Sequence, residues 1–293
     1  MDAVKSPPAA SGSHRCPESK AYCWDAEDYA ANSSAQFDWG VELMEKLAWR
    51  GDERVLDLGC GDGKLSARLA EHVPAGSVTG IDASARMIAL AHARWVEKTQ
   101  STTQSTTQST KQRLSFVQMD AQALRFESAF DVVFSNAVLH WVSDHPVVMT
   151  GVRRALQPGG RLLLQTPGVG NCAEFVEAVD QVRGRARWRS FFRGFTFPWR
   201  FSAVTEYAHW LDRAGLETQR IERIHKDMRH SGPEALVGWM RSTWLPYLER
   251  LPGTQRGVFV SDVIDRYLMQ VPTDDAGCTH VDMVRLEVAA VRR

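Results

Sequence analysis

The chain has 293 residues, 44% of them hydrophobic, which is enough for one large α/β domain with a buried core and a modest elaboration. Its 35 basic and 35 acidic residues balance, so no overall positive field exists to hold a phosphate backbone, which argues against a nucleic-acid-binding protein. The five cysteines are scattered and lack CxxC spacing, which argues against a zinc site and predicts free thiols. No apolar run is long enough to span a bilayer, so we expect a cytoplasmic protein that does not bind membranes.

The N-terminal region divides into two parts. Residues 1–20 are rich in proline, serine and alanine and cannot bury a hydrophobic face, which predicts a disordered tail. Residues 21–293 then form a single catalytic domain. Within it, apolar side chains at near-helical spacing over residues 24–49 predict one or two helices that lead into the sheet.

Short apolar runs alternate with helical patterns along the next part of the chain, which is typical of parallel strands joined by crossover helices. Five such runs span residues 54–58, 77–81, 114–118, 130–135 and 161–165. The fourth and fifth are separated by a predicted helix, 143–156, and a Gln-Pro-Gly-Gly turn. Two late segments, 218–229 and 281–291, predict an antiparallel hairpin at the sheet edge. The expected fold is a seven-stranded, mostly parallel α/β sheet.

Three insertions interrupt or follow this pattern. Residues 98–112 repeat a Ser-Thr-Thr-Gln unit without apolar side chains, which predicts a flexible surface insertion. Segments 170–202 and 232–276 are helical and aromatic and predict a helical lid. The first of them carries alternating aromatic and basic side chains that could line a cavity or form the core of the lid: Trp188, Phe191, Phe192, Phe195, Phe197 and Trp199, with Arg187, Arg189, Arg193 and Arg200.

A glycine-rich turn, DLGCGDG at residues 57–63, follows the first predicted strand, where open α/β sheets bind ligands. Its G-x-G-x-G spacing is one residue shorter than the dinucleotide pattern. Acidic residues stand at three successive strand ends: Asp57, Asp82 and Asp120. Each alone could cap a helix, but together they favour a nucleoside site, with Asp82 placed to accept hydrogen bonds from ribose hydroxyls.

The segments VLDLGCGDGKLSARLA, VTGIDASARMIALA, FDVVFSNAVLHWV and LQPGGRLLLQTP resemble the successive motifs of class I S-adenosylmethionine-dependent methyltransferases. The resemblance covers residues 24–167 and implies a Rossmann-like fold with S-adenosylmethionine as cofactor. It implies a cofactor site built from Asp57, Gly59 and Gly61 near the methionine part, Asp82 on the ribose, Asp120 and Ala121 on the adenine, Ala83 and Met87 on the adenosine, and Asn136 beside the ligand. Met87 could equally be an ordinary core methionine.

The end of the fourth strand bears on the methyl acceptor. It reads SNAVLHW, without the Asn/Asp-Pro-Pro-Tyr/Phe motif of enzymes that methylate nucleobases or glutamine, and we find no obvious metal-binding carboxylates. The segments YAANSSAQ (29–36) and LHWV (139–142) resemble carboxyl methyltransferases of small acids, of the trans-aconitate and juvenile hormone acid type. The resemblance implies that Gln36 and Trp141 face the substrate carboxylate, although Trp141 could also be a packing residue. His140 is either a general base or a structural histidine.

The leading hypothesis is O-methylation of a small carboxylic acid, which is already ionised at pH 7 and needs no base. A hydroxyl or amine acceptor is the second hypothesis. An NAD-dependent oxidoreductase and a binding module without turnover are alternatives from other classes. A monomer and a homodimer both remain open.

Overall fold

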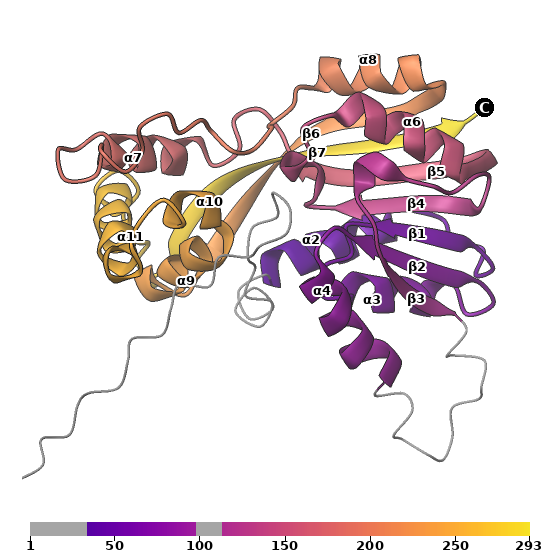
Figure 1. The fold of residues 1–293 in the computed structure, drawn as a ribbon, viewed down its shortest axis with the longest axis horizontal. Coiled ribbons are helices and arrows are strands. Elements are labelled where there is room, and N and C mark those ends of the chain that lie inside the picture. The colour runs from indigo at the N-terminus through magenta and orange to yellow at the C-terminus, as the bar shows by residue number, and fades with distance from the viewer. Residues whose placement is uncertain (1–33, 98–112) are drawn as a thin grey trace, which may run out of the picture.

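The computed structural model describes residues 34–97 and 113–293, which form one seven-stranded sheet with flanking helices and a helical group at one end (Figure 1). The strands are β1 (Arg54–Leu58), β2 (Ser77–Asp82), β3 (Leu114–Gln118), β4 (Phe130–Asn136), β5 (Leu156–Pro167), β6 (Leu216–His230) and β7 (Thr279–Arg292). Their order is β3-β2-β1-β4-β5-β7-β6. The first five strands are parallel, and β7 is antiparallel to both β5 and β6. The predicted seven-stranded, mostly parallel Rossmann-like sheet is confirmed.

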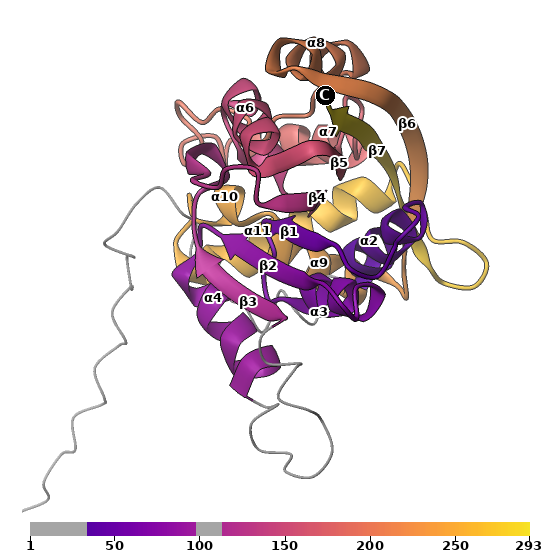
Figure 2. The ribbon, with the colours of Figure 1, turned by 90° about the vertical axis from the view of Figure 1, so that its right-hand side faces the viewer.

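Helices cover both faces of the sheet, as Figures 1 and 2 show. One face carries α2 (Ser34–Glu45), α3 (Lys64–His72) and α4 (Ala85–Ala91, extended by a π-helical turn, His92–Glu97), and the other carries α6 (His145–Ala155) and α8 (Val204–Ala214). On β4, Val132 and Phe134 pack with side chains of α2 and α3, while Val133 packs with those of α6 and α8. This burial on both faces explains why the central strands are continuous apolar runs.

The remaining helices form a separate helical group beyond the main sheet, where β6 and β7 extend past the other strands (Figure 1). Its members are α7 (Ala173–Arg183), α9 (Pro233–Thr243), α10 (Leu245–Leu248) and α11 (Gly253–Leu268). The ring of Phe175 lies at the centre, 5.0 Å from the rings of Trp239, Trp244 and Tyr267. The two segments expected to form a lid are therefore packed together, and their action as a lid stays a prediction.

Strand β5 differs from its predicted bounds because it begins at Leu156 rather than near Arg161. Phe130 of β4 pairs with Leu156, whereas Val132 pairs with Arg161, so the four residues in between bulge out of the ladder. The predicted Gln-Pro-Gly-Gly turn is this bulge. The predictions for residues 1–20, 24–33 and 98–112 lie outside the described residues, and within the described ranges no helix is long and apolar enough to cross a membrane.

Candidate functional site

The glycine turn after β1 is fixed by main-chain hydrogen bonds and by tight packing. The amides of Gly59 and Cys60 donate to the carbonyl of Ile81 at 2.8 and 2.9 Å. Gly59 has a φ of 80°, and a Cβ there would lie 2.3 Å from a methyl carbon of Val138. Gly61 has a φ of 55°, but a Cβ there would meet no atom within 4 Å. The turn therefore leaves open space beside Gly61, as a backbone cradle for a ligand requires.

The carboxylate of Asp82 joins this turn to the end of β2. Its Oδ2 accepts the amide of Gly61 at 3.1 Å, and its Oδ1 accepts the amide of Ser84 at 2.8 Å. Burial raises the pKa of Asp82, although the two amide hydrogen bonds oppose that shift. A carboxylate oxygen can accept more than one hydrogen bond, so this fixed carboxylate retains acceptor capacity for two hydroxyl groups.

Asp57 lies deeper, and only 2% of its surface is exposed. The hydroxyl of Ser66 on α3 donates to its Oδ2 at 2.6 Å. Burial raises the pKa of Asp57 to about 7, and the nearby charge of Asp82 acts in the same direction. Asp57 thus ties the end of β1 to the helix that follows the glycine turn, and its contact with the cofactor stays a prediction.

The residues expected around the adenosine lie on neighbouring strand ends. Asp120 follows β3 and is exposed, and its Oδ1 caps the short 3₁₀ helix Ala121–Ala123 by accepting the amide of Gln122 at 2.8 Å. Ala83 follows β2 and is also exposed, whereas Met87 is buried in α4. Because β2 and β3 are adjacent, these positions lie along one edge of the sheet. Their contacts with adenosine stay predictions.

The end of β4 holds the start of α2. The buried side chain of Asn136 donates from its Nδ2 to the main-chain carbonyl of Gln36 at 2.8 Å. The next residue, Ala137, has a positive φ of 55°, a strained conformation for a residue with a Cβ, and its amide donates to the carbonyl of Gln165 at 2.9 Å. The chain therefore leaves the sheet sharply after Asn136, next to Gln36.

A cavity, here called the β4 cavity, lies where the end of β4 meets α2, β7 and the helical group. Its lining includes Gln36, His140, Trp141, Trp199, Trp244 and Arg285. The lining combines hydrogen-bond donors and aromatic walls with one buried cation, and none of the described residues that line it is acidic. The three residues expected to act on the acceptor thus lie around one cavity.

Two aromatic residues after β4 differ in what they offer this cavity. Burial holds the pKa of His140 well below its usual range, and the charge of Arg285 adds to this shift, so its imidazole is neutral at pH 7. The main-chain carbonyl of His140 accepts the amide of Arg200 at 2.9 Å. The ring of Trp141 packs edge-on against that of Trp199, with centroids 5.6 Å apart. Trp141 therefore both packs and lines the cavity.

The aromatic and basic segment expected near the acceptor belongs mostly to the core of the helical group. The indole of Trp188 donates to Asp262 at 2.8 Å, and Phe192 packs in the same cluster. From this set, Trp199 lines the β4 cavity, while its four arginines are exposed. The cavity's cation is instead Arg285, which sequence reasoning missed. An arginine among the mostly apolar residues of segment 281–291 was the available signal.

Known proteins resemble this chain in sequence and in structure. A family model described as "Methyltransferase domain" matches residues 56–164. The chain is 30% identical to an uncharacterized methyltransferase of Schizosaccharomyces pombe, covering 69% of this chain and 74% of that protein. It is 29% identical to a trans-aconitate 2-methyltransferase of Deinococcus radiodurans, covering 81% of this chain and 87% of that protein. A Haemonchus contortus N-methyltransferase, solved with phosphomonomethylethanolamine and S-adenosylhomocysteine, has the same fold, with a TM-score of 0.56, 20% identity, and 91% and 57% of the two chains covered.

The glycine cradle and the fixed Asp82 carboxylate lie at the carboxyl end of the parallel strands. They fit S-adenosylmethionine, which has a carboxylate, a ribose and an adenine to bind there. Similarity over most of the chain agrees with that geometry. The chain therefore belongs to the class I S-adenosylmethionine-dependent methyltransferases.

Proposed function

We propose that this enzyme transfers the methyl group of S-adenosylmethionine to a carboxylate oxygen of a small organic acid. The observation that carries this proposal is the β4 cavity, whose described lining residues present an amide side chain, an indole and a buried guanidinium and include no acidic side chain. Such a lining suits an anionic acceptor, because it offers donors and positive charge without repulsion. Relatives over most of the chain bear the name trans-aconitate 2-methyltransferase, and that name describes a small acid as acceptor.

The reaction is an in-line displacement. S-adenosylmethionine supplies an electrophilic methyl group; a carboxylate oxygen forms the new C–O bond as the C–S bond breaks, which gives a methyl ester and S-adenosylhomocysteine. The protein's task is to align the two reactants and to exclude water. Gln36 and Trp141 are assigned to orient the acceptor carboxylate with their N–H groups, while Gly61 and Asp82 hold the donor.

A hydroxyl acceptor is the second candidate, because a neutral His140 lines the cavity and could accept a proton. The same burial that keeps His140 neutral makes it a weak base, since its pKa lies well below 6.5. A weak base is poorly matched to the removal of a hydroxyl proton at neutral pH. A carboxylate needs no such step, which supports the acid as acceptor.

The cellular setting is also part of the proposal. Cys60, Cys172 and Cys278 are free thiols, as is usual in a reducing compartment, which supports a cytoplasmic location. A small metabolite acceptor is supported by the aromatic walls of the β4 cavity.

A transfer assay with S-adenosylmethionine carrying a labelled methyl group tests the function directly. The acceptor panel contains small carboxylic acids together with the alcohol and the amide of the same carbon skeleton. We expect label in an alkali-labile methyl ester of one or more acids and none in the matched alcohols and amides. Label in an alkali-stable product of a matched alcohol or amide would contradict carboxyl methylation and leave the methyltransferase assignment intact.

A further inference from the structure

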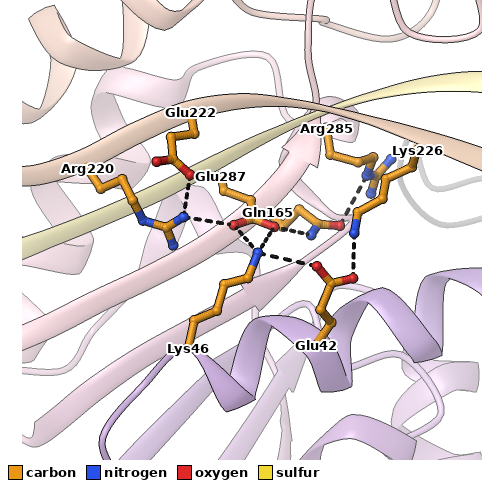
Figure 3. Close-up of polar contacts among 8 residues, drawn as sticks. All are labelled: Glu42, Lys46, Gln165, Arg220, Glu222, Lys226, Arg285 and Glu287. Atoms are coloured by element: carbon orange, nitrogen blue, oxygen red, sulfur yellow. Dashed lines mark hydrogen bonds and ion pairs between the residues drawn. The ribbon is translucent and has the colours of Figure 1, made fainter.

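Glu287 is a fully buried carboxylate of β7 that accepts hydrogen bonds from three side chains, as Figure 3 shows. The ammonium of Lys46 lies 2.9 and 2.8 Å from its two oxygens. Nε2 of Gln165 donates to it at 3.0 Å, and Nη1 of Arg220 at 3.2 Å. The three donors come from the end of α2, from β5 and from β6. Glu287 therefore joins a helix to three neighbouring strands.

Lys46 connects this carboxylate to α2. It directly follows the last residue of α2, and Gln36 lies ten positions earlier, in the first turn of the helix, which corresponds to about 15 Å along the axis. Between them, Glu42 pairs with Lys226 of β6. At the start of the helix, the main-chain carbonyl of Gln36 accepts the hydrogen bond from Asn136. Polar contacts thus attach α2 to the sheet at three points along its length.

The ion pair adds a constraint that the apolar face of α2 does not supply. Leu43 and Met44 of α2 pack in one cluster with Phe134 of the sheet, but apolar contacts are non-directional and tolerate small shifts. An ammonium that meets both oxygens of a buried carboxylate favours one geometry, and a shift of the helix along its axis would break it. The ion pair therefore fixes the register of α2 on the sheet.

Glu287 reaches the β4 cavity by a second route, through Gln165. Because a carboxylate can only accept, it selects the orientation of Gln165 in which Nε2 faces Glu287 and Oε1 faces away. Oε1 then accepts Nε of Arg285, which lines the cavity, at 3.1 Å. The main-chain carbonyl of Gln165 also accepts the amide of Ala137, the first residue after β4, at 2.9 Å. The polar network thus extends to the cavity wall.

The two cations that hold Glu287 lead in different directions. Lys46 leads through α2 to Gln36, which lines the β4 cavity. Arg220 belongs to β6 and is not among the described residues that line the cavity. Loss of either cation leaves Glu287 with the other cation and with Gln165. A comparison of the two losses therefore separates the positioning of α2 from general stabilisation of the network.

We propose that the Lys46–Glu287 ion pair is a positioning device for acceptor binding, which fixes α2 along the sheet and thereby places the side chain of Gln36 in the β4 cavity. Lys46 and Glu287 are positioning residues that act through Gln36. The inference rests on the proposed function, since it assumes that Gln36 contacts the carboxylate of a small acid.

Amide hydrogen exchange of the ligand-free protein tests the attachment of α2 without any acceptor. Lys46→Met should raise exchange in residues 34–45 by about 10-fold, because the end of the helix opens locally when its ion pair is lost. Arg220→Met, which removes the other cation from the same carboxylate, is the matched control and should leave α2 within about twofold of wild type. Melting temperatures show that the variants are folded. Should Lys46→Met be unfolded, Lys46→Gln keeps an N–H donor for Glu287 and should give the same pattern with a smaller change.

Calorimetry on protein saturated with S-adenosylhomocysteine tests the effect on the acceptor. The probes are succinate, butyrate and benzoate, three acids of different shape. Lys46→Met should weaken the binding of the tightest of them by about 10-fold, because a displaced Gln36 no longer meets the carboxylate. Arg220→Met should leave that affinity within about twofold. Both variants should bind S-adenosylhomocysteine as wild type does.

A double-mutant cycle tests whether Lys46 acts through Gln36. In the Gln36→Ala background, Lys46→Met should weaken binding of the same acid by less than about twofold, because the side chain that it positions is gone. A merely structural role of Lys46 would give the same 10-fold loss in both backgrounds. KM values for any of the three acids that is methylated should follow the same pattern.

The outcomes separate this inference from the proposed function. Equal effects of Lys46→Met and Arg220→Met on acid affinity, or a full effect of Lys46→Met without Gln36, would overturn the inference, and methyl ester formation by the wild type would still support the proposed function. If acid binding depends on Lys46 only when Gln36 is present and no acid is methylated, the positioning role stands and the proposed function fails. If the wild type binds none of the three acids, the inference is overturned.

Discussion

The side chain of Asn136 donates a 2.8 Å hydrogen bond to the main-chain carbonyl of Gln36. This contact joins two parts of the site that are 100 residues apart in sequence: the end of β4, beside the predicted cofactor, and the first turns of α2, which line the β4 cavity. The position of Gln36 therefore depends on a residue that the resemblance had placed next to the cofactor. Loss of this contact should disturb the acceptor side of the site more than the donor side.

Asn136→Ala is expected to lower the free energy of unfolding by about 1–3 kcal/mol, because it leaves a buried carbonyl without its donor. Urea denaturation measures this change, and an acceptor titration should show a raised KM. The matched control is Gln118→Ala, which removes a 3.2 Å side-chain amide hydrogen bond to the carbonyl of Ala83 at an exposed position. The control should cost less than about 0.5 kcal/mol. Equal losses in the two variants would contradict the importance given to the buried contact.

Asp82→Ala should weaken S-adenosylmethionine binding by about 1.5–3 kcal/mol, roughly 10- to 150-fold, because the charge-assisted hydrogen bonds predicted between Asp82 and the ribose would be lost. The amides of Gly61 and Ser84 also lose their acceptor, which loosens the glycine turn. Asp82→Asn keeps one acceptor oxygen, so its affinity for S-adenosylmethionine should lie between that of the wild type and that of Asp82→Ala. Calorimetry with S-adenosylhomocysteine gives the affinities, and an unchanged affinity would remove Asp82 from the cofactor site.

Asp57 predicts a specific dependence of stability on pH. Its pKa is about 7 in the folded protein against an ordinary value of 3.8, so the folded state retains a proton that the unfolded state releases. The corresponding contribution to stability is complete below about pH 3.8 and is lost as the pH rises through 7. In the ligand-free protein, the stability advantage of Asp57→Asn over wild type should therefore increase between pH 5 and pH 8. Urea denaturation across that range checks this, and a constant difference would indicate that Asp57 is ionised throughout.

Much of the fold was predictable because its signals are local. The local signals are the apolar runs of β1 to β5, the glycine turn, and the acids at or near the ends of β1, β2 and β3. Each of these acids lies in or beside its own strand, so one strand and its turn suffice to identify it. The start of β5 was misplaced for the opposite reason. Leu156 joins the ladder through its pairing with Phe130, a tertiary contact that outweighs the turn signal of Gly159 and Gly160.

The polar network around Arg285 could not be predicted in the same way. Arg285 and Glu287 are two residues apart and so share one face of β7, but their partners Gln165, Lys46 and Arg220 come from β5, α2 and β6. Sequence shows the charged residues and not which elements surround them. The proposed acceptor side of the site is assembled from such distant segments, which is why the donor side was the easier to infer.

Gln36→Ala and Trp141→Phe should impair methyl transfer while leaving S-adenosylmethionine affinity close to that of wild type, because both residues line the β4 cavity and not the glycine turn. The expected loss is about 1–3 kcal/mol per contact, or roughly 5- to 150-fold in kcat/KM, since each change leaves part of a desolvated carboxylate without a donor. Trp141→Phe is the sharper change: it removes the indole N–H and keeps much of the wall that packs on Trp199. Phe197→Leu, at an exposed position of the same aromatic segment, is the control and should retain full activity. If both cavity variants match this control on the identified acid, the acceptor carboxylate binds elsewhere.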